Sequence, residues 1–178
     1  MEFRKLDVKD YPRFLALYNE TFPGDQRREY KDEKDLDTFI NEHKGKFHGI
    51  AIDDGGDDFI GFLTYWTFKG YVYIEHFAVA PEHRGKNIGR KLLHHLFEEV
   101  SPDVLVEVEH PDTVDNQRRI HFYEQCGFRI RKEFNYTQPP YGPGQGHVEL
   151  LLMTHGDVKL DSKRDIEEML REVYNVNM

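Results

Sequence analysis

The stretch from residue 71 to residue 100, YVYIEHFAVAPEHRGKNIGRKLLHHLFEEV, constrains the fold more than any other part of the chain. An apolar run over 71–79 predicts a strand, and leucines at helical spacing from Leu92 onward predict a helix. The loop between them holds a proline and two glycines. The first turn of a helix has unpaired N–H groups and a partial positive charge, and glycines let a ligand approach the backbone closely. The stretch therefore predicts a strand–loop–helix unit suited to an anion such as phosphate.

Basic side chains in this loop add to that signal, namely those of His83, Arg84, Lys86 and Arg90. The loop is neither a GxxxxGK[ST] phosphate loop nor a GxGxxG dinucleotide fingerprint. A plain connection between strand and helix is therefore the alternative interpretation.

The composition limits the classes of protein that this chain can represent. Its 178 residues suit one domain with a sizeable core. No apolar run approaches the roughly 20 residues of a membrane span, and the N-terminus lacks the apolar segment of a secretory signal. The single cysteine, Cys126, excludes an internal disulfide. We therefore expect a cytoplasmic protein without a membrane partner.

The net charge of −9 argues against a nucleic-acid partner, because nucleic-acid binding depends on neutralising phosphates. The same charge is compatible with a cationic amine substrate, although acidic proteins are common.

The remaining apolar patterns and turn signals predict alternating strands and helices. In chain order they predict a strand at 2–6, a helix capped by Asp7 or Asp10 and ending at Pro23, a helix at 33–43, strands at 47–52 and 59–68 joined by a turn over DDGGDD, a strand at 104–109, a helix at 115–126, strands at 128–137 and 147–155, and a helix within 156–178. The expected fold class is α/β in the mixed α+β sense, with a sheet covered by helices.

Two motifs in this order resemble those of the GCN5-related N-acetyltransferase (GNAT) superfamily. Residues Arg84–Gly89 match its acetyl-CoA loop R/Q-x-x-G-x-G/A, with Asn87 at the position of the first glycine. Asparagine tolerates the left-handed backbone better than most residues, so the loop can still form. The helix motif N-x-x-A-x-x-x-Y-E-x-x-G-F is matched at Asn116, Tyr123, Glu124, Gly127 and Phe128, with Arg119 in place of the alanine.

The resemblance covers roughly residues 2–155 and implies the fold of that family. We expect a central, mostly antiparallel mixed sheet of about seven strands flanked by helices in a domain over 1–155. Residues 156–178 are expected to form a C-terminal helical extension of the same domain. The runs TFPGDQRREY, VEVEHP, RRIHFYEQCGF and QPPY look like a bacterial subgroup without a settled substrate.

The resemblance also implies an acetyl-CoA-dependent N-acetyltransferase that acts on a primary amine, by direct attack in a ternary complex. A small-molecule amine is the first expectation; a protein or peptide amine and a non-catalytic acyl-CoA-binding module are the alternatives. The residues implied to bind coenzyme A are Phe77, Ala78, Val79, Arg84, Gly85, Lys86, Asn87, Ile88, Gly89, Arg90, Asn116 and Tyr123.

Catalysis of amine acylation needs a group that takes a proton from the amine and one that supplies a proton to the thiolate. The resemblance implies that Tyr123 protonates the thiolate, with a packed core aromatic as the alternative. Glu75, Glu107 and Glu109 are the candidate bases. Glu75 interrupts an apolar strand, which is costly unless it faces a wet cleft. Its alternative roles are those of a solvated strand-end residue or a structural ion pair. Asn116 has a capping or first-turn role as its alternative.

Candidate acceptor contacts lie in two polar stretches and at one strand end. They are Arg27, Arg28, Tyr30, His110, Tyr136 and Tyr141, with solvated or rigid surface positions as the alternative. The ten histidines show no metal-ligand spacing, so no metal is expected. Cys126 has no recognisable base partner and reads as a small packed residue. The apolar stripe of the last helix either packs back on the sheet or pairs with another subunit, which predicts a monomer or a homodimer.

Overall fold

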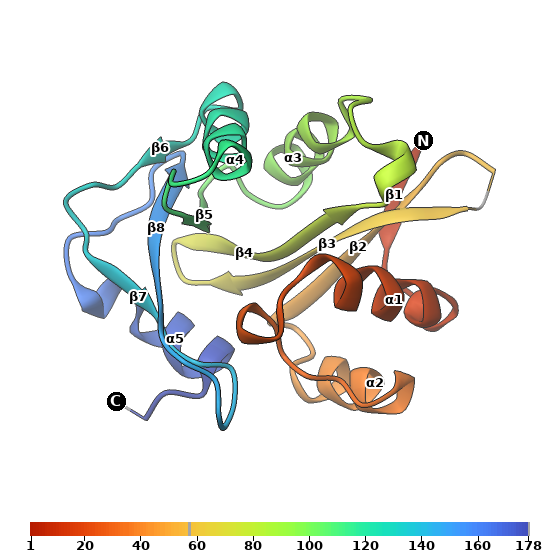
Figure 1. Ribbon diagram of the computed structural model, residues 1–178, viewed down its shortest axis with the longest axis horizontal. Coiled ribbons are helices and arrows are strands. Elements are labelled where there is room, and N and C mark those ends of the chain that lie inside the picture. The colour runs from red at the N-terminus through yellow and green to blue at the C-terminus, as the bar shows by residue number, and fades with distance from the viewer. Residues whose placement is uncertain (57, 178) are drawn as a thin grey trace. The chain divides into compact units, whose positions relative to one another are not determined.

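The computed structural model describes residues 1–56 and 58–177 (Figure 1). Asp57, in the predicted hairpin turn, and Met178, at the end of the predicted extension, lie outside the described residues. Eight described strands belong to one mostly antiparallel sheet, and five α-helices accompany them. The chain divides into two compact units: the first unit comprises 1–67 and 74–95, and the second comprises 68–73 and 96–178. The fold class expected from the sequence is confirmed.

The strands of the first unit follow one another across the sheet in the order β1, β2, β3, β4. Their bounds are Glu2–Lys5, Phe47–Asp53, Phe59–Phe68 and Tyr71–Val79, of which the first three residues of β4 and the last of β3 belong to the second unit. Pairing of β2 with β3 is antiparallel and places Phe47 opposite Trp66. This pairing agrees with the mostly antiparallel sheet that the family resemblance implies.

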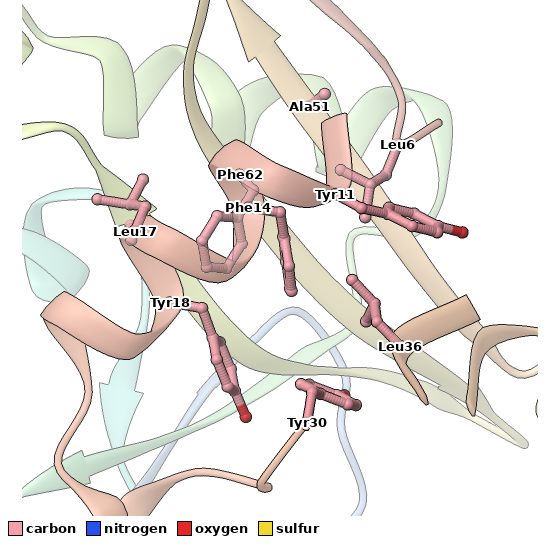
Figure 2. Packing of buried hydrophobic residues seen from close by; sticks show 10 residues of the cluster. Leu6, Tyr11, Phe14, Leu17, Tyr18, Tyr30, Leu36, Ala51 and Phe62 are labelled. Atoms are coloured by element: carbon pink, nitrogen blue, oxygen red, sulfur yellow. The ribbon is translucent and has the colours of Figure 1, made fainter. Parts of the chain in front are cut away.

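Helices α1 (Tyr11–Thr21) and α2 (Glu33–Glu42) cover one side of these strands. Phe14 and Tyr18 of α1 pack toward Phe62 of β3, with ring centroids 4.3 Å and 6.4 Å from that of Phe62 (Figure 2). Leu36 of α2 is fully buried in the same cluster. This apolar packing fixes α1 and α2, and hence the segment between them, against the strands.

The second unit is built around β8 (Val148–His155), which pairs antiparallel with three strands. These are β5 (Val104–Glu109), β6 (Arg129–Ile130) and β7 (Tyr136–Gln138). Helix α3 (Ile88–Glu99) enters this unit at residue 96, and α4 (Val114–Gln125) connects β5 to β6. The start of β4 belongs here too, because the Val72 amide donates to the Asp103 carbonyl over 2.9 Å.

The single strand predicted over 128–137 is wrong, because the chain forms two short strands there. Five residues lie between Ile130 and Tyr136, whereas two lie between their partners Met153 and Leu150 on β8. The extra residues form a turn, closed by a hydrogen bond from the Phe134 amide to the Arg131 carbonyl over 3.1 Å. Arg131 is buried and donates to the Val158 carbonyl over 3.0 Å, which holds the turn against the following segment.

The C-terminal helix α5 (Glu167–Tyr174) is part of the second unit and lies beside β7 and β8 (Figure 1). The predicted apolar stripe is buried, with Ile166 1% and Met169 0% exposed. The stripe therefore packs within this chain, and the predicted boundary between residues 155 and 156 falls inside the second unit.

Candidate functional site

The loop between β4 and α3 has the backbone that an anion site needs. Gly85 and Asn87 both adopt positive φ, at 78° and 62°. The Arg84 Nε donates to the Val79 carbonyl over 2.9 Å and ties the loop to the end of β4. The Asn87 carbonyl accepts the first helical hydrogen bond, from the Lys91 amide over 3.3 Å. The prediction that asparagine takes the left-handed conformation in place of glycine is confirmed.

The same loop has room for a ligand at its glycine. A β-carbon added at Gly85 would meet no atom within 4 Å, and Arg84, Lys86 and Arg90 are exposed. Helix α3 presents the N–H groups of its first turn at this place, and those groups have no carbonyl partners within the helix. Ile88, by contrast, is buried and anchors the turn. These residues fit a phosphate-bearing group such as coenzyme A.

The predicted pantetheine-binding backbone at the end of β4 alternates in burial. Ala78 is buried, and Phe77 and Val79 are half-buried. The Val79 carbonyl accepts from Arg84, so its role in this structure is to hold the loop.

Glu75 of β4 is held in a charge pair inside the first unit. Its side chain is 1% exposed, and its Oε1 accepts from the Arg28 Nη2 over 3.0 Å. The other oxygen accepts from the Trp66 indole Nε1 over 2.9 Å. Burial alone opposes ionisation, but the Arg28 charge and these hydrogen bonds hold the pKa of Glu75 below its ordinary value. Of the roles considered for Glu75, the geometry matches the structural ion pair.

Arg28 and Tyr30, predicted to touch the acceptor, belong to this same network. The Arg28 guanidinium carbon lies 4.2 Å from the centroid of the Phe39 ring. The Tyr18 hydroxyl accepts from the Arg28 amide over 2.8 Å and donates to its carbonyl over 3.0 Å. Tyr30 is buried, which raises its pKa to about 12. Both predicted residues therefore have structural partners.

Arg27 has hydrogen-bond partners on the segment that precedes it. Its Nε donates to the Phe22 carbonyl over 3.0 Å and its Nη1 to the Asn19 Oδ1 over 2.9 Å. It also pairs with Glu29 over 3.3 Å. These contacts hold the segment between α1 and α2.

Glu107 of β5 has partners of another kind, within the second unit. Its Oε1 accepts from the Tyr136 hydroxyl, and the Tyr174 hydroxyl lies 2.8 Å and 2.7 Å from its two oxygens. The Tyr73 and Tyr174 hydroxyls are 3.0 Å apart. Burial first, and then the Glu107 charge, raise the pKa values of Tyr136 and Tyr174 well above the ordinary range. Both phenols therefore stay protonated and donate to the carboxylate.

The second unit contains further residues that the sequence predicts to belong to the site, namely Glu109, His110, Asn116 and Tyr141. Glu109 is half-buried and shares the Glu107 face of β5, as strand alternation requires. The His110 carbonyl accepts from the Asn116 Nδ2 over 3.0 Å, so Asn116 holds the connection from β5 to α4. Thr113 caps α4 by accepting from the Asn116 amide, which places Asn116 in the first helical turn. The Tyr141 ring packs 4.8 Å from that of Tyr174.

Tyr123 of α4 is a buried phenol. Its ring lies 5.1 Å from the ring of Phe128, and Gly127 between them takes a positive φ of 91°. Burial raises the pKa of Tyr123 to about 12, which the Arg119 charge opposes only in part. The phenol therefore keeps its proton at neutral pH. Cys126 ends the helix and is half-buried.

Two residues complete these networks without a sequence motif that marks them. Trp66 lies within the strand expected over 59–68, and the one available signal is that a buried indole N–H requires an acceptor. Tyr174 lies four residues after Leu170 on the stripe of α5, and that spacing predicts the shared face but not the carboxylate partner.

None of the described helices is both long and apolar enough to cross a bilayer. Over 1–56 and 58–177, no three His, Cys, Asp or Glu side chains gather as ligands for a metal ion.

Comparisons with known proteins give similarities along most of the chain. Residues 11–128 match the sequence model of the Acetyltransferase (GNAT) family. A protein of Bacillus subtilis (strain 168) named "Putative acetyltransferase YjbC" is 23% identical over 148 residues, which cover 82% of this chain and 72% of that protein.

Solved structures extend the similarity to nearly the whole chain. A GNAT-family structure from Bacteroides thetaiotaomicron is 34% identical, covers 99% of this chain and 100% of its own, and superposes with a TM-score of 0.84. A spermidine N-acetyltransferase chimera that includes the Vibrio cholerae enzyme SpeG is 18% identical, with coverage of 87% and 95% and a TM-score of 0.65, which is a likeness of fold.

Proposed function

The chain belongs to the acetyltransferase (GNAT) family, and from that premise we propose that it transfers the acetyl group of acetyl-CoA to a primary amine of a small molecule. The amine attacks directly while both substrates are bound. The observation that carries the proposal is the loop of β4–α3, with Gly85 and Asn87 left-handed and the first turn of α3 open to a phosphate.

The chain's own groups fit the proton transfers of this reaction. An amine attacks only as the free base, so a carboxylate or a water must remove its proton. Tyr123 holds its proton at neutral pH and can pass it to the leaving thiolate. Backbone N–H groups at the end of β4 supply the class of donor that stabilises a developing oxyanion.

A small cationic amine is the acceptor class that we favour. The net charge of −9 raises the local concentration of cations at the surface. Structures of the same fold include proteins titled spermidine N-acetyltransferase, so polyamines belong in a substrate panel. A protein or peptide amine as acceptor, and acyl-CoA binding without catalysis, are the competing functions.

The first experiment measures acetyl-CoA binding by calorimetry. We expect Gly85→Val to weaken binding at least about ten-fold, because a β-branched residue at positive φ distorts the loop and fills the space beside it. Gly45→Val is the matched control: Gly45 also has positive φ, at 88°, and open space around its added β-carbon, but it lies before β2. Equal affinity of both variants for acetyl-CoA would contradict the loop assignment.

The second experiment follows thiol release with a panel of monoamines, polyamines and peptides. Acetylation of small amines with little on peptides supports the proposal, and the reverse selects the protein acceptor. Binding of acetyl-CoA without turnover on any amine, and with no effect of Tyr123→Phe, selects the binding module. We further propose a cytoplasmic monomer or homodimer, which fractionation and a solution mass test.

A further inference from the structure

Gly61 of β3 lies against the end of β4, the neighbouring strand of the sheet. A β-carbon added at Gly61 would lie 2.6 Å from the Ala78 carbonyl oxygen and 3.2 Å from the Val79 α-carbon. Both atoms belong to the backbone, so neither can rotate away as the end of a side chain would. The two strands can approach this closely because position 61 has no side chain.

Gly49 of β2 is closely packed as well, but against a different neighbour. A β-carbon added there would lie 2.8 Å from the Leu6 β-carbon. The Leu6 amide donates to the Gly49 carbonyl over 2.8 Å, which joins the end of β1 to β2. Gly49 therefore belongs to the packing of the N-terminal strand, whereas Gly61 packs against the strand that leads into the β4–α3 loop.

The chain enters the β4–α3 loop directly from the backbone that Gly61 contacts. The Ala80 amide donates to the Ile60 carbonyl over 2.8 Å, so the residue before Gly61 holds the residue after Val79. The Val79 carbonyl in turn accepts from the Arg84 Nε over 2.9 Å, and Arg84 directly precedes the left-handed part of the loop. A displacement of this backbone is therefore passed on to the loop through two hydrogen bonds.

Ala78 and Val79 are also among the residues expected to offer their backbone to the pantetheine arm. A site made of backbone groups depends on where the chain lies, and it functions well only within about 0.5 Å of its productive geometry. An ordinary carbon–oxygen contact is about 3.3 Å or longer, so relief of the 2.6 Å contact requires a larger displacement than that. The space at position 61 therefore controls the geometry of this backbone.

We propose that Gly61 is a positioning residue for the coenzyme A site. The absence of a side chain at Gly61 sets where residues 78–80 lie, and through them the pantetheine-binding backbone and the phosphate loop. The inference rests on the proposed acetyl-CoA-dependent function and adds to it a residue outside the loop and helix motifs. Gly61 has no side chain with which to contact a ligand, so it acts through the backbone of β4.

The test compares Gly61→Ala with Gly49→Ala, each of which adds one methyl group within the first unit at a contact of 2.6 Å or 2.8 Å. We expect Gly61→Ala to weaken acetyl-CoA binding about ten-fold in calorimetry, because a misplacement of about 1 Å costs up to about 100-fold at a functional site. Gly49→Ala should bind acetyl-CoA with wild-type affinity, whatever loss of thermal stability it shows.

Two readouts separate positioning from a general loss of structure. In Gly61→Ala the KM for acetyl-CoA should rise about ten-fold while the KM for the amine stays near its wild-type value, whereas a partly unfolded enzyme would lose kcat alone. Adding Ile52→Val removes a side-chain contact of 3.1 Å at position 61 but leaves the Ala78 carbonyl in place, so it should not restore the affinity. Wild-type affinity in this double variant would overturn the backbone mechanism.

A measurement on the wild-type protein keeps the inference testable if Gly61→Ala does not fold. With saturating acetyl-CoA, hydrogen exchange of the Ala80 amide should slow at least about ten-fold more than that of the Leu6 amide, although both amides make a 2.8 Å bond to a neighbouring strand. Equal slowing of both amides, or wild-type affinity in folded Gly61→Ala, would overturn the inference. A wild-type protein that binds no acetyl-CoA would instead overturn the proposed function on which it rests.

Discussion

Glu75 on β4 and Glu107 on β5 are the same residue type on strands of one sheet, yet different kinds of side chain bind their carboxylates. Glu75 is bound by Arg28 and by the indole of Trp66 and is closed off from solvent. Glu107 is bound by the hydroxyls of Tyr136 and Tyr174. A guanidinium brings a positive charge to a carboxylate, whereas a phenol hydroxyl brings a hydrogen bond. The comparison shows that two glutamates on strands of one sheet can be held by partners of different chemistry.

The largest effect that this comparison predicts comes from removing the cation. Arg28→Ala leaves Glu75 buried without its ion-pair partner, and we expect a loss of about 3–5 kcal/mol in the free energy of unfolding. Urea denaturation at pH 7 measures it. Arg13→Ala, which breaks an exposed ion pair with Asp58, is the control and should cost less than about 1 kcal/mol. Similar losses for both variants would show that Glu75 does not depend on its partner.

A smaller effect with a distinct pH signature is expected for Glu75→Gln. Its amide can still accept a hydrogen bond, so we expect a cost of about 1.5–3 kcal/mol at pH 7. The pKa of Glu75 is lower in the folded protein than its ordinary 4.5, so its stabilisation is fully present above about pH 4.5 and is lost as the pH falls through the folded value. The stability difference between the wild type and Glu75→Gln should therefore shrink below pH 4.5. A difference that stays constant from pH 7 to pH 3 would contradict the assignment of Glu75 as the ion-paired carboxylate.

Removing one phenol from Glu107 should cost less stability than removing the cation from Glu75. Tyr174→Phe deletes a hydrogen bond to a half-buried carboxylate that keeps Tyr136 as a donor, and we expect a loss of about 1–2 kcal/mol. The measurement is again urea denaturation at pH 7, with Tyr71→Phe alongside. A loss as large as that of Arg28→Ala would mean that Glu107 is a structural centre like Glu75, and the contrast between the two sites would disappear.

The smallest expected effect is that of Tyr71→Phe on stability. The hydroxyl is buried without a hydrogen-bond partner among the described residues, so its removal should change the free energy of unfolding by less than about 0.5 kcal/mol or stabilise the protein. Thermal unfolding at pH 7 checks this value. Clear destabilisation would indicate that the Tyr71 hydroxyl belongs to the hydrogen bonding around Glu107.

Much of the fold followed from local patterns in the sequence. The bounds of β3, β4 and β5 agree with the apolar runs, and the left-handed backbone at Asn87 agrees with the tolerance of asparagine for that conformation. The strand expected over 128–137 failed because its interruption depends on Arg131, whose buried guanidinium bonds a carbonyl 27 residues away. No local pattern reports such a contact.

The sequence by itself determined the family, the order of elements and the face of the strand on which each glutamate lies, because these depend on motifs and on the two-residue period of a strand. Only the tertiary structure decided their partners. Arg28 is 47 residues from Glu75, and Tyr174 is 67 residues from Glu107. Pairing over such separations is fixed by how whole elements pack, and that packing is a sum of many weak apolar contacts rather than a property of either residue.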